Sequence, residues 1–465
     1  MDFGQQGIPQ PPPATGSTEA ATEAAKDDGA VLTLEKAIAR GLEGNRAYQR
    51  ARQESDRARG RQNEARSQRN LTASGSAAYT RLDNGQTISV GPTSVVGTYP
   101  DQTNFTAEIR LPVDVAGLLR TNVQATELQR LLVEMDAQSL HNQLLLDIRT
   151  AYYRALRARS LHMVAEAAME NARTRLQDAR IAHREGIVPQ FDVLRAQTGL
   201  ASAQQRRIQA ANEVQLARAA LHELIGLPLE YNSALQEPDA VTRLAEAQLA
   251  EARTEPDDKR TVASETVPPE GAVSAEYETA IARALTQRPE ILAANINLRA
   301  SELGITLARR SLAPSFGLQA SAQYNPNAGA FQQRDLLTVG AQLTIPFSDG
   351  GLARARRQQA EADHAIAQTL RQQVEEQIRL EVQQAMLYRR EAFDRLQVAI
   401  QARQEAREAS RMATVRYRSG VTRAGISPLL EVSDAQTAET QAESDITNAL
   451  YDVLVAEARL DKALG

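Results

Sequence analysis

Residues 37–40 read Ala-Ile-Ala-Arg, and residues 280–283 read Ala-Ile-Ala-Arg again. The stretch Leu224-Ile225-Gly226 likewise has a counterpart in the last three residues, Ala463-Leu464-Gly465. Between these marks, prolines and glycines recur at a constant spacing, because Pro112, Gly117 and Gly186 correspond to Pro346, Gly351 and Gly420. Such self-similarity predicts a chain built from two equivalent halves.

The repeat divides the chain into four predicted segments. The first 33 residues contain several prolines among Gly, Ser, Thr and Ala, and they are expected to be disordered. No apolar run follows Met1, so this start does not read as a signal peptide. Residues 34–226 form the first structural repeat, residues 227–277 a proline-containing linker, and residues 278–465 the second repeat.

Each half contains one very long helical pattern between two glycines, at 117–186 and 351–420. A helix of that length measures roughly 100 Å, which no compact globule requires. Its apolar residues step by threes and fours as in a coiled coil, for example Leu145, Ile148, Tyr152 and Ala155. Shorter helical patterns at 37–70, 189–226, 280–313 and 428–465 are expected to pair, two at a time, antiparallel to one long helix.

Four segments of about ten residues alternate between apolar and polar side chains, and they form two predicted β-hairpins at 71–113 and 316–347. This is the length of a tilted strand that crosses a membrane, although a half-buried hairpin of a soluble protein has the same pattern. Four strands leave unpaired edges, so several copies of the chain are expected to complete the sheet. Aromatic residues near the strand ends fit two membrane-interface belts or ordinary core positions, namely Tyr79, Tyr324, Phe316 and Phe347.

The composition excludes several classes of function. The 53 Lys and Arg residues against 58 Asp and Glu give a net charge of −5, which offers no basic surface for nucleic acid. The absence of Cys excludes disulfides and thiolate metal sites. The sequence contains no run of about 18 apolar residues, so a membrane-spanning helix is not expected.

Motifs of the common enzyme classes are also missing. The sequence has no Gly-Lys-Ser/Thr loop, no Gly-x-Ser-x-Gly elbow and no His-Glu-x-x-His pair. His141, His162 and His183 are 21 residues apart, about 30 Å on a helix, and cannot share a metal ion. We therefore expect no enzyme activity, no cofactor and no metal site.

Two motifs at equivalent ends of the repeats give the chain a specific resemblance. Residues 186–197 read G-I-V-P-Q-F-D-V-L-R-A-Q, and residues 429–436 read L-L-E-V-S-D-A-Q. Together with the ordered repeat of helix, hairpin, long helix and helix, they make residues 34–465 similar to the TolC outer-membrane efflux family.

The resemblance implies a mainly α fold with a β part, shared between three copies of the chain. Long antiparallel coiled-coil helices would form a trimeric α-barrel in the periplasm of a Gram-negative-type cell. The four strands of each chain would contribute to one 12-stranded β-barrel in outer-membrane lipid. The expected partners are two further copies of the chain, a periplasmic adaptor (membrane fusion) protein and an inner-membrane pump of the RND, ABC or MFS type.

The resemblance also implies roles for residues near the helix tips. In the family a Tyr and an Arg near the second tip bond to an Asp near the first, and these correspond to Tyr417, Arg423 and Asp192. Arg423 lies beside an insertion at 422–426. An inner acidic ring corresponds to Glu431 and Asp434, and such a ring in a narrow aperture favours cations. The adaptor would dock beside the tip residues Gly186, Pro189, Gly420 and Pro428.

A simpler interpretation of Asp192 and Glu431 is that each is an acid in the first turn of a helix, where it complements the helix dipole. The main functional hypothesis is a passive export duct that partners open at its helix tips. The alternative is a soluble coiled-coil scaffold or adaptor-like hairpin protein without a membrane part. The sequence leaves open whether the cargo is a drug, a metal ion or a protein, and which pump drives it.

Overall fold

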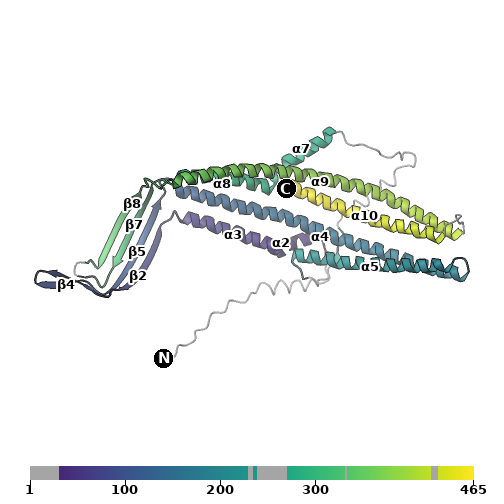
Figure 1. Ribbon diagram of the computed structural model, residues 1–465, viewed down its shortest axis with the longest axis horizontal. Coiled ribbons are helices and arrows are strands. Elements are labelled where there is room, and N and C mark those ends of the chain that lie inside the picture. The colour runs from purple at the N-terminus through teal and green to yellow at the C-terminus, as the bar shows by residue number, and fades with distance from the viewer. Residues whose placement is uncertain (1–30, 229–233, 238–269, 330–331, 420–427) are drawn as a thin grey trace, which may run out of the picture. The chain divides into compact units, whose positions relative to one another are not determined.

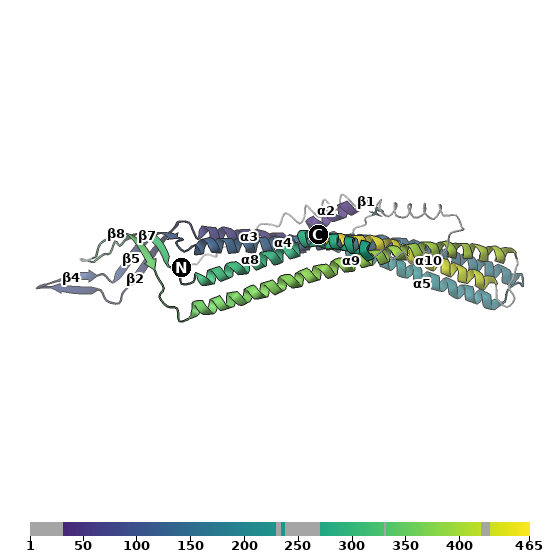
Figure 2. The same ribbon diagram turned by 90° about the horizontal axis from the view of Figure 1, so that it is seen from above.

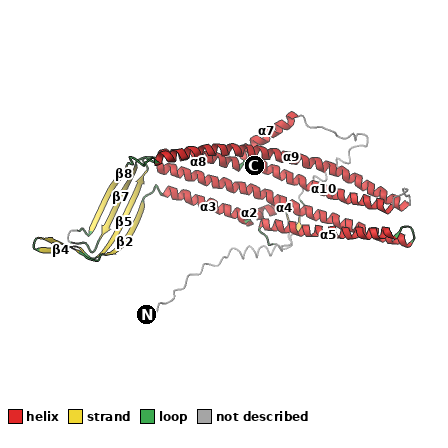
Figure 3. Ribbon diagram, viewed as in Figure 1, coloured by secondary structure: helices red, strands yellow, loops and turns green. Residues whose placement is uncertain are grey.

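The computed structural model describes residues 31–228, 234–237, 270–329, 332–419 and 428–465 (Figure 1). Helices dominate these residues, and the four longest strands lie in one sheet (Figure 3). The chain forms two compact units. Unit 1 contains Met1–Gln49, Leu140–Gln287 and Ile378–Gly465, and unit 2 contains Arg50–Ser139 and Arg288–Gln377.

The two long helices predicted from the sequence are confirmed as α4 (Leu118–Arg184, 67 residues) and α9 (Leu352–Ser419, 68 residues). An aspartate begins each of them by accepting hydrogen bonds from the free backbone N–H groups of the first turn. The carboxylate of Asp114 accepts from the N–H groups of Leu119 and Arg120 at 3.1 and 2.8 Å. Asp349 does the same for α9, accepting from Gly351 at 3.0 Å and from Ala353 at 2.5 Å.

The shorter helices that follow the tips also agree with the prediction. They are α5 (Gln190–Ile225) and α10 (Pro428–Leu464). Gly226 ends α5 in the left-handed conformation (φ 74°), and its N–H bonds back to the carbonyls of the last turn. A Cβ atom at Gly226 would lie 2.8 Å from the carbonyl oxygen of Gly44, so the two backbones approach as closely as only glycine permits.

The helices that open each repeat correct the prediction, because each is interrupted. The first is divided at Asn45 into α2 (Leu34–Gly44) and α3 (Arg46–Ser67). The Asn45 side chain donates to the carbonyl of Leu224 at 3.0 Å and accepts from the N–H of Tyr48 at 3.1 Å, so it caps the new helix.

The second opening helix is divided at the equivalent position. Arg288 separates α7 (Glu270–Gln287) from α8 (Pro289–Arg309). Here Pro289 forces the residue before it out of the helical conformation, which the sequence pattern of apolar residues does not reveal. Arg288 is nonetheless buried and pairs with Glu290 at 3.1 Å.

The four long strands form one antiparallel sheet in the order β2-β5-β7-β8, which confirms both predicted hairpins (Figure 1). Their bounds are β2 (Thr72–Arg81), β5 (Asp101–Val113), β7 (Ser315–Tyr324) and β8 (Asp335–Thr344). The register places Ala73, Ile109, Ala320 and Val339 opposite one another across all four strands. β8 ends before Pro346, so Phe347 lies beyond the strand expected to contain it.

Four additional strands were not predicted. β3 (Gln86–Val90) and β4 (Thr93–Thr98) form a hairpin that projects beyond the sheet of unit 2 (Figures 1 and 2). β1 (Val31–Leu32) and β6 (Ala234–Leu235) form a short parallel pair. The structure thus gives residues 31–33, which were expected to be disordered, a defined place. In the expected linker it places β6, and α7 begins at Glu270 rather than after residue 277.

The short β1–β6 pair covers the main core of unit 1. Ile148, Tyr152, Leu156, Leu221 and Ile225 are fully buried there. The Tyr152 hydroxyl lies 2.8 Å from the carbonyl oxygen of Leu32 and 2.6 Å from that of Gln236, so one side chain ties both strands to α4. Burial, above all, raises the pKa of Tyr152 to about 12.

A second core lies between α9 and α10 and consists mainly of small side chains. Ala392, Leu396 and Ala399 on α9 and Ala449, Val453 and Ala456 on α10 follow the same steps of four and three residues. Alanine at the seam lets two helices approach closely, as the low aromatic content of 4% suggests. The coiled-coil pattern therefore determines how these helices pair.

Candidate helix-tip site

The first tip connects α4 to α5 through a glycine turn. Gly186 is left-handed (φ 75°), and its N–H donates to His183 O at 3.0 Å. The N–H of Ile187 reaches back to Ala182 O at 2.9 Å, which satisfies the last carbonyls of α4. Pro189 then occupies the position before α5. Gly186 and Pro189 thus form the expected sharp turn between the two helices.

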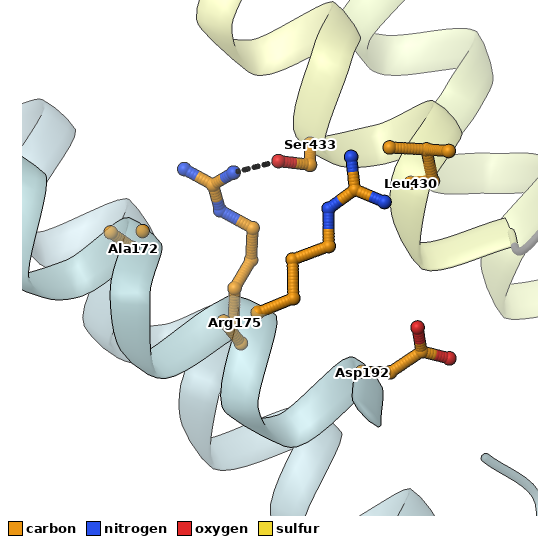
Figure 4. Close-up of a pocket in the computed structure, with 8 residues that line it drawn as sticks. Ala172, Arg175, Asp192, Leu430 and Ser433 are labelled. Carbon is orange, nitrogen blue, oxygen red and sulfur yellow. Dashed lines mark hydrogen bonds between the residues drawn. The ribbon is translucent and has the colours of Figure 1, made fainter. Parts of the chain in front are cut away.

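Asp192 lies in the first turn of α5 and is only 7% exposed. It lines a cavity of about 40 Å³ with residues of α4, α5 and α10, among them Arg175 and Ser433 (Figure 4). The other lining residues are Ala172, Arg195, Ala196, Gly199 and Leu430. Asp192 stands in the first turn of α5, so the helix-dipole interpretation applies to it, and it also lines a cavity with Arg175 and Arg195.

The second tip, between α9 and α10, holds the remaining predicted gate residues. Tyr417 is half-buried, and its pKa is raised by burial and then by the negative charge of Asp178 on α4. Glu431 pairs with Arg416 at 2.5 Å, which joins α10 to α9, and Asp434 is exposed. Gly420 and Arg423 lie outside the described residues, and Pro428 is the first residue of α10.

The structure therefore assembles the predicted residues into three local groups. Asp192 shares a cavity with Arg175 and Ser433, and Glu431 bonds to Arg416. The pKa of Tyr417 is raised by burial and by the negative charge of Asp178. Sequence reasoning missed Arg175, because a single arginine in a long, arginine-rich helix carries no distinguishing signal. Ser433 was part of a motif used for the resemblance, but no role was assigned to it.

The sheet of unit 2 has one apolar and one polar face. When the register is applied, the apolar positions of the four alternating patterns fall on the same side, while Ala78 and Leu336 lie on the other. Side chains of the apolar face are exposed in the chain, among them Phe105, Ile109, Leu318, Leu337 and Val339. Tyr79 and Tyr324 lie toward one end of the strands, and Phe316 and Phe347 toward the other.

None of the helices in the part of the chain that the structure describes is both long and apolar enough to cross a membrane. No group of three or more His, Asp or Glu side chains in the described ranges could hold a metal ion.

Comparison with known proteins identifies the family. The profile of the outer membrane efflux protein family matches residues 37–227 and 280–465, which are the two repeats. A curated relative, the pyoverdine export outer membrane protein OpmQ of Pseudomonas putida, is 25% identical over 342 residues, or 71% of this chain. That match spans 63% of the relative's own length.

Solved structures share the fold. The Campylobacter jejuni CmeC outer membrane channel has a TM-score of 0.73 at 16% identity, covering 93% of this chain and 85% of that one. The open state of the Neisseria gonorrhoeae MtrE outer membrane channel has a TM-score of 0.70 at 19% identity, covering 93% and 88%.

The family match covers both structural repeats and confirms the resemblance drawn from the tip motifs. Members of this family are outer-membrane efflux channels and not enzymes, in agreement with the motif analysis. The chain belongs to the family of outer membrane efflux proteins.

Proposed function

We propose that three copies of this chain form a passive export channel in the outer membrane. Their sheets would join, edge to edge, into a 12-stranded β-barrel, and their long helices would form an α-barrel in the periplasm. The observation that carries this proposal is the sheet, which has one apolar face with exposed side chains and one polar face. Lipid outside and water inside a barrel suit these two faces.

The two edge strands of the sheet support a barrel made from more than one copy of the chain. β2 and β8 are the outermost strands of the four-stranded sheet, and each pairs on one side within the described chain. Unpaired strand edges are unfavourable in lipid, because their N–H and C=O groups find no water. Joining β2 of one copy to β8 of the next removes every edge.

The test of this proposal is purification followed by electrical recording. The protein is expected to require detergent, to migrate as a trimer that heating converts to monomers, and to form channels in planar lipid bilayers. A water-soluble monomer without channel activity would instead support the coiled-coil scaffold and refute the channel.

We further propose that the tips control access to the channel, with Asp192, Tyr417, Arg423, Glu431 and Asp434 as the gate residues. Support comes from the buried Asp192 in a cavity between α4, α5 and α10 and from the Arg416–Glu431 pair beside the second tip. These contacts hold the helices of one copy together near their tips, and opening must weaken some of them.

The first tip is the proposed docking site for a periplasmic adaptor, which would connect the channel to an inner-membrane pump. Ile187, Phe191 and Leu194 are exposed there, beside Gly186 and Pro189. Phe191 and Leu194 are three residues apart on one face of α5, and Ile187 precedes them in the turn, so the three side chains form an apolar stripe at this helix end. An α-helical hairpin of the adaptor with apolar residues at its own tip would cover this stripe.

Replacing Phe191 by aspartate is expected to reduce binding of the cognate adaptor at least tenfold, because the apolar contact is lost and a charge must be desolvated. Binding of the purified trimer to immobilised adaptor measures this effect. Gln190→Asp introduces the same charge at the neighbouring exposed position and serves as the control. Equal binding by both variants would exclude the stripe as the docking site.

A further inference from the structure

Side-chain contacts connect the α4–α5 hairpin to the α9–α10 hairpin within unit 1. Arg149 pairs with Asp461 at 2.9 Å and Arg157 with Asp452 at 3.2 Å. The hydroxyls of Ser160 and Tyr451 lie 3.4 Å apart, and Arg175 donates to the Ser433 hydroxyl at 3.1 Å. Of these contacts, the Arg175–Ser433 bond is nearest to the tips, about 14 Å from the end of α4 and about 8 Å from the start of α10.

These contacts differ in chemistry. Arg149 and Arg157 pair with carboxylates, Ser160 and Tyr451 form a neutral contact, and the Arg175 guanidinium reaches a neutral hydroxyl. The side chains of both ion pairs are about a third or more exposed, and exposed ion pairs stabilise little. The link nearest the tips thus joins α4 to α10 without a carboxylate, through one hydrogen bond of a partly buried guanidinium.

The surroundings of Arg175 disfavour its charged form, so the guanidinium needs hydrogen-bond partners such as Ser433. Burial lowers the pKa of Arg175, and the positive charge of Arg206 adds to the effect. Its Nε donates to the carbonyl of Asn171 on its own helix at 3.3 Å, which fixes the side chain so that its terminal nitrogen points at α10. A partly buried charge needs such hydrogen bonds, and the Ser433 hydroxyl provides one of them.

Packing around the link is incomplete. The cavity beside it, lined by Ala172, Gly199 and Leu430 among others, holds about 40 Å³, enough for one or two water molecules (Figure 4). Farther from the tips, the buried Ile148, Tyr152 and Leu454 pack in a dense core. The Arg175–Ser433 bond is therefore a polar contact between α4 and α10 beside a small cavity, and it is next in sequence to the buried Leu176 and Val432.

We propose that Arg175 is a positioning residue that acts as a releasable latch between the two helical hairpins of one copy. In the closed channel its bond to Ser433 holds α10, and with it the second tip, against α4. Opening breaks this bond while the ion pairs at Arg149 and Arg157 keep the hairpins joined. This inference rests on the proposed function, since it assigns one residue to the opening of the tips.

The test is the single-channel conductance of the purified trimer in planar bilayers. Arg175→Met retains the aliphatic volume but removes the donors, and Ser433→Ala removes the acceptor. Loss of a hydrogen bond to a charged group shifts an equilibrium about tenfold or more, so both variants are expected to increase the open fraction by about that factor. Ser433→Thr keeps the hydroxyl and is expected to behave like the parent protein.

Arg173→Met is the matched control, because Arg173 lies on the same helix with a largely exposed side chain. The heat stability of the trimer is measured for every variant, so that simple unfolding is recognised. The double variant of Arg175 and Ser433 is expected to match the single variants, since one bond is lost in each. Unchanged conductance in both single variants, with the parent protein still forming channels, would overturn the latch and leave the channel proposal intact.

A second measurement replaces the hydrogen bond by a covalent link that can be made and broken. The chain contains no cysteine, so Arg175→Cys combined with Ser433→Cys gives the only two thiols. A short, reducible bis-maleimide that joins them is expected to hold the tips closed and abolish export, and reductant is expected to restore it. Normal export by the cross-linked protein would contradict the proposal. A parent protein that forms no channel at all would refute the proposed function instead.

Discussion

Replacing Val339 by arginine is expected to abolish assembly of the trimer in the outer membrane, whereas replacing its neighbour Thr338 by arginine is expected to be tolerated. Val339 lies on the apolar face of β8 and is 76% exposed, and Thr338 lies on the opposite, polar face. If the apolar face meets lipid, an arginine near the bilayer midplane costs about 2–4 kcal/mol per copy, and three copies carry it. On the polar face the same side chain remains in water.

The measurement is the amount of heat-modifiable trimer in the outer-membrane fraction for each variant. Val339 and Thr338 are adjacent in the centre of the same strand, so differences in strand propensity are small. If the Val339 variant assembles as well as the Thr338 variant, the apolar face does not meet lipid. If the Thr338 variant alone fails, the two faces are reversed relative to the proposal.

Replacing Asp192 by alanine is expected to open the channel, with a rise in the open fraction of at least about tenfold, because a buried carboxylate beside arginines is lost. Asp192 is 7% exposed and shares its cavity with Arg175 and Arg195. Asp192→Asn keeps the shape but removes the charge, so its effect isolates the electrostatic part. Replacing Tyr417 by phenylalanine removes one half-buried hydroxyl and is expected to have a smaller effect in the same direction.

Conductance in planar bilayers and sensitivity of cells to large antibiotics measure the opening. Glu185→Gln is the control, since Glu185 is an exposed acid at the end of α4, close in sequence to the same tip. Conductance that stays at the parent value for both Asp192 variants would remove this residue from the gate. Equal increases for the control and for Asp192→Asn would show that overall charge near the tip, rather than the buried carboxylate, controls opening.

The sequence predicted the long helices and the hairpins because their signals are local and repeated. Steps of three and four residues along α4 and alternation along β5 each specify one secondary structure and one apolar side. The glycine at 186 and the proline at 189 mark a turn by their backbone requirements alone. Because the chain is a repeat, each element is predicted once in each half, and two short motifs were then enough to recognise the family.

The interruption at Asn45 and the β1–β6 pair could not be predicted, because they depend on partners far along the chain. Asn45 ends one helix and begins the next while its side chain bonds to Leu224, 179 residues away. β1 and β6 are two residues each, too short for any periodic pattern, and the buried Tyr152 hydroxyl ties them to α4.

The candidate site likewise has features that the sequence predicts and features that only the tertiary structure shows. The sequence by itself determined that the chain is a twofold repeat of long helices and hairpins, and it placed Asp192 and Glu431 beside turns, because periodicity and turn chemistry are properties of neighbouring residues. Only the tertiary structure showed that Arg175 reaches Ser433 across two hairpins and that Asp192 is buried beside it. Such contacts are set by how helices pack against one another, which depends on side chains more than 250 positions apart in the sequence.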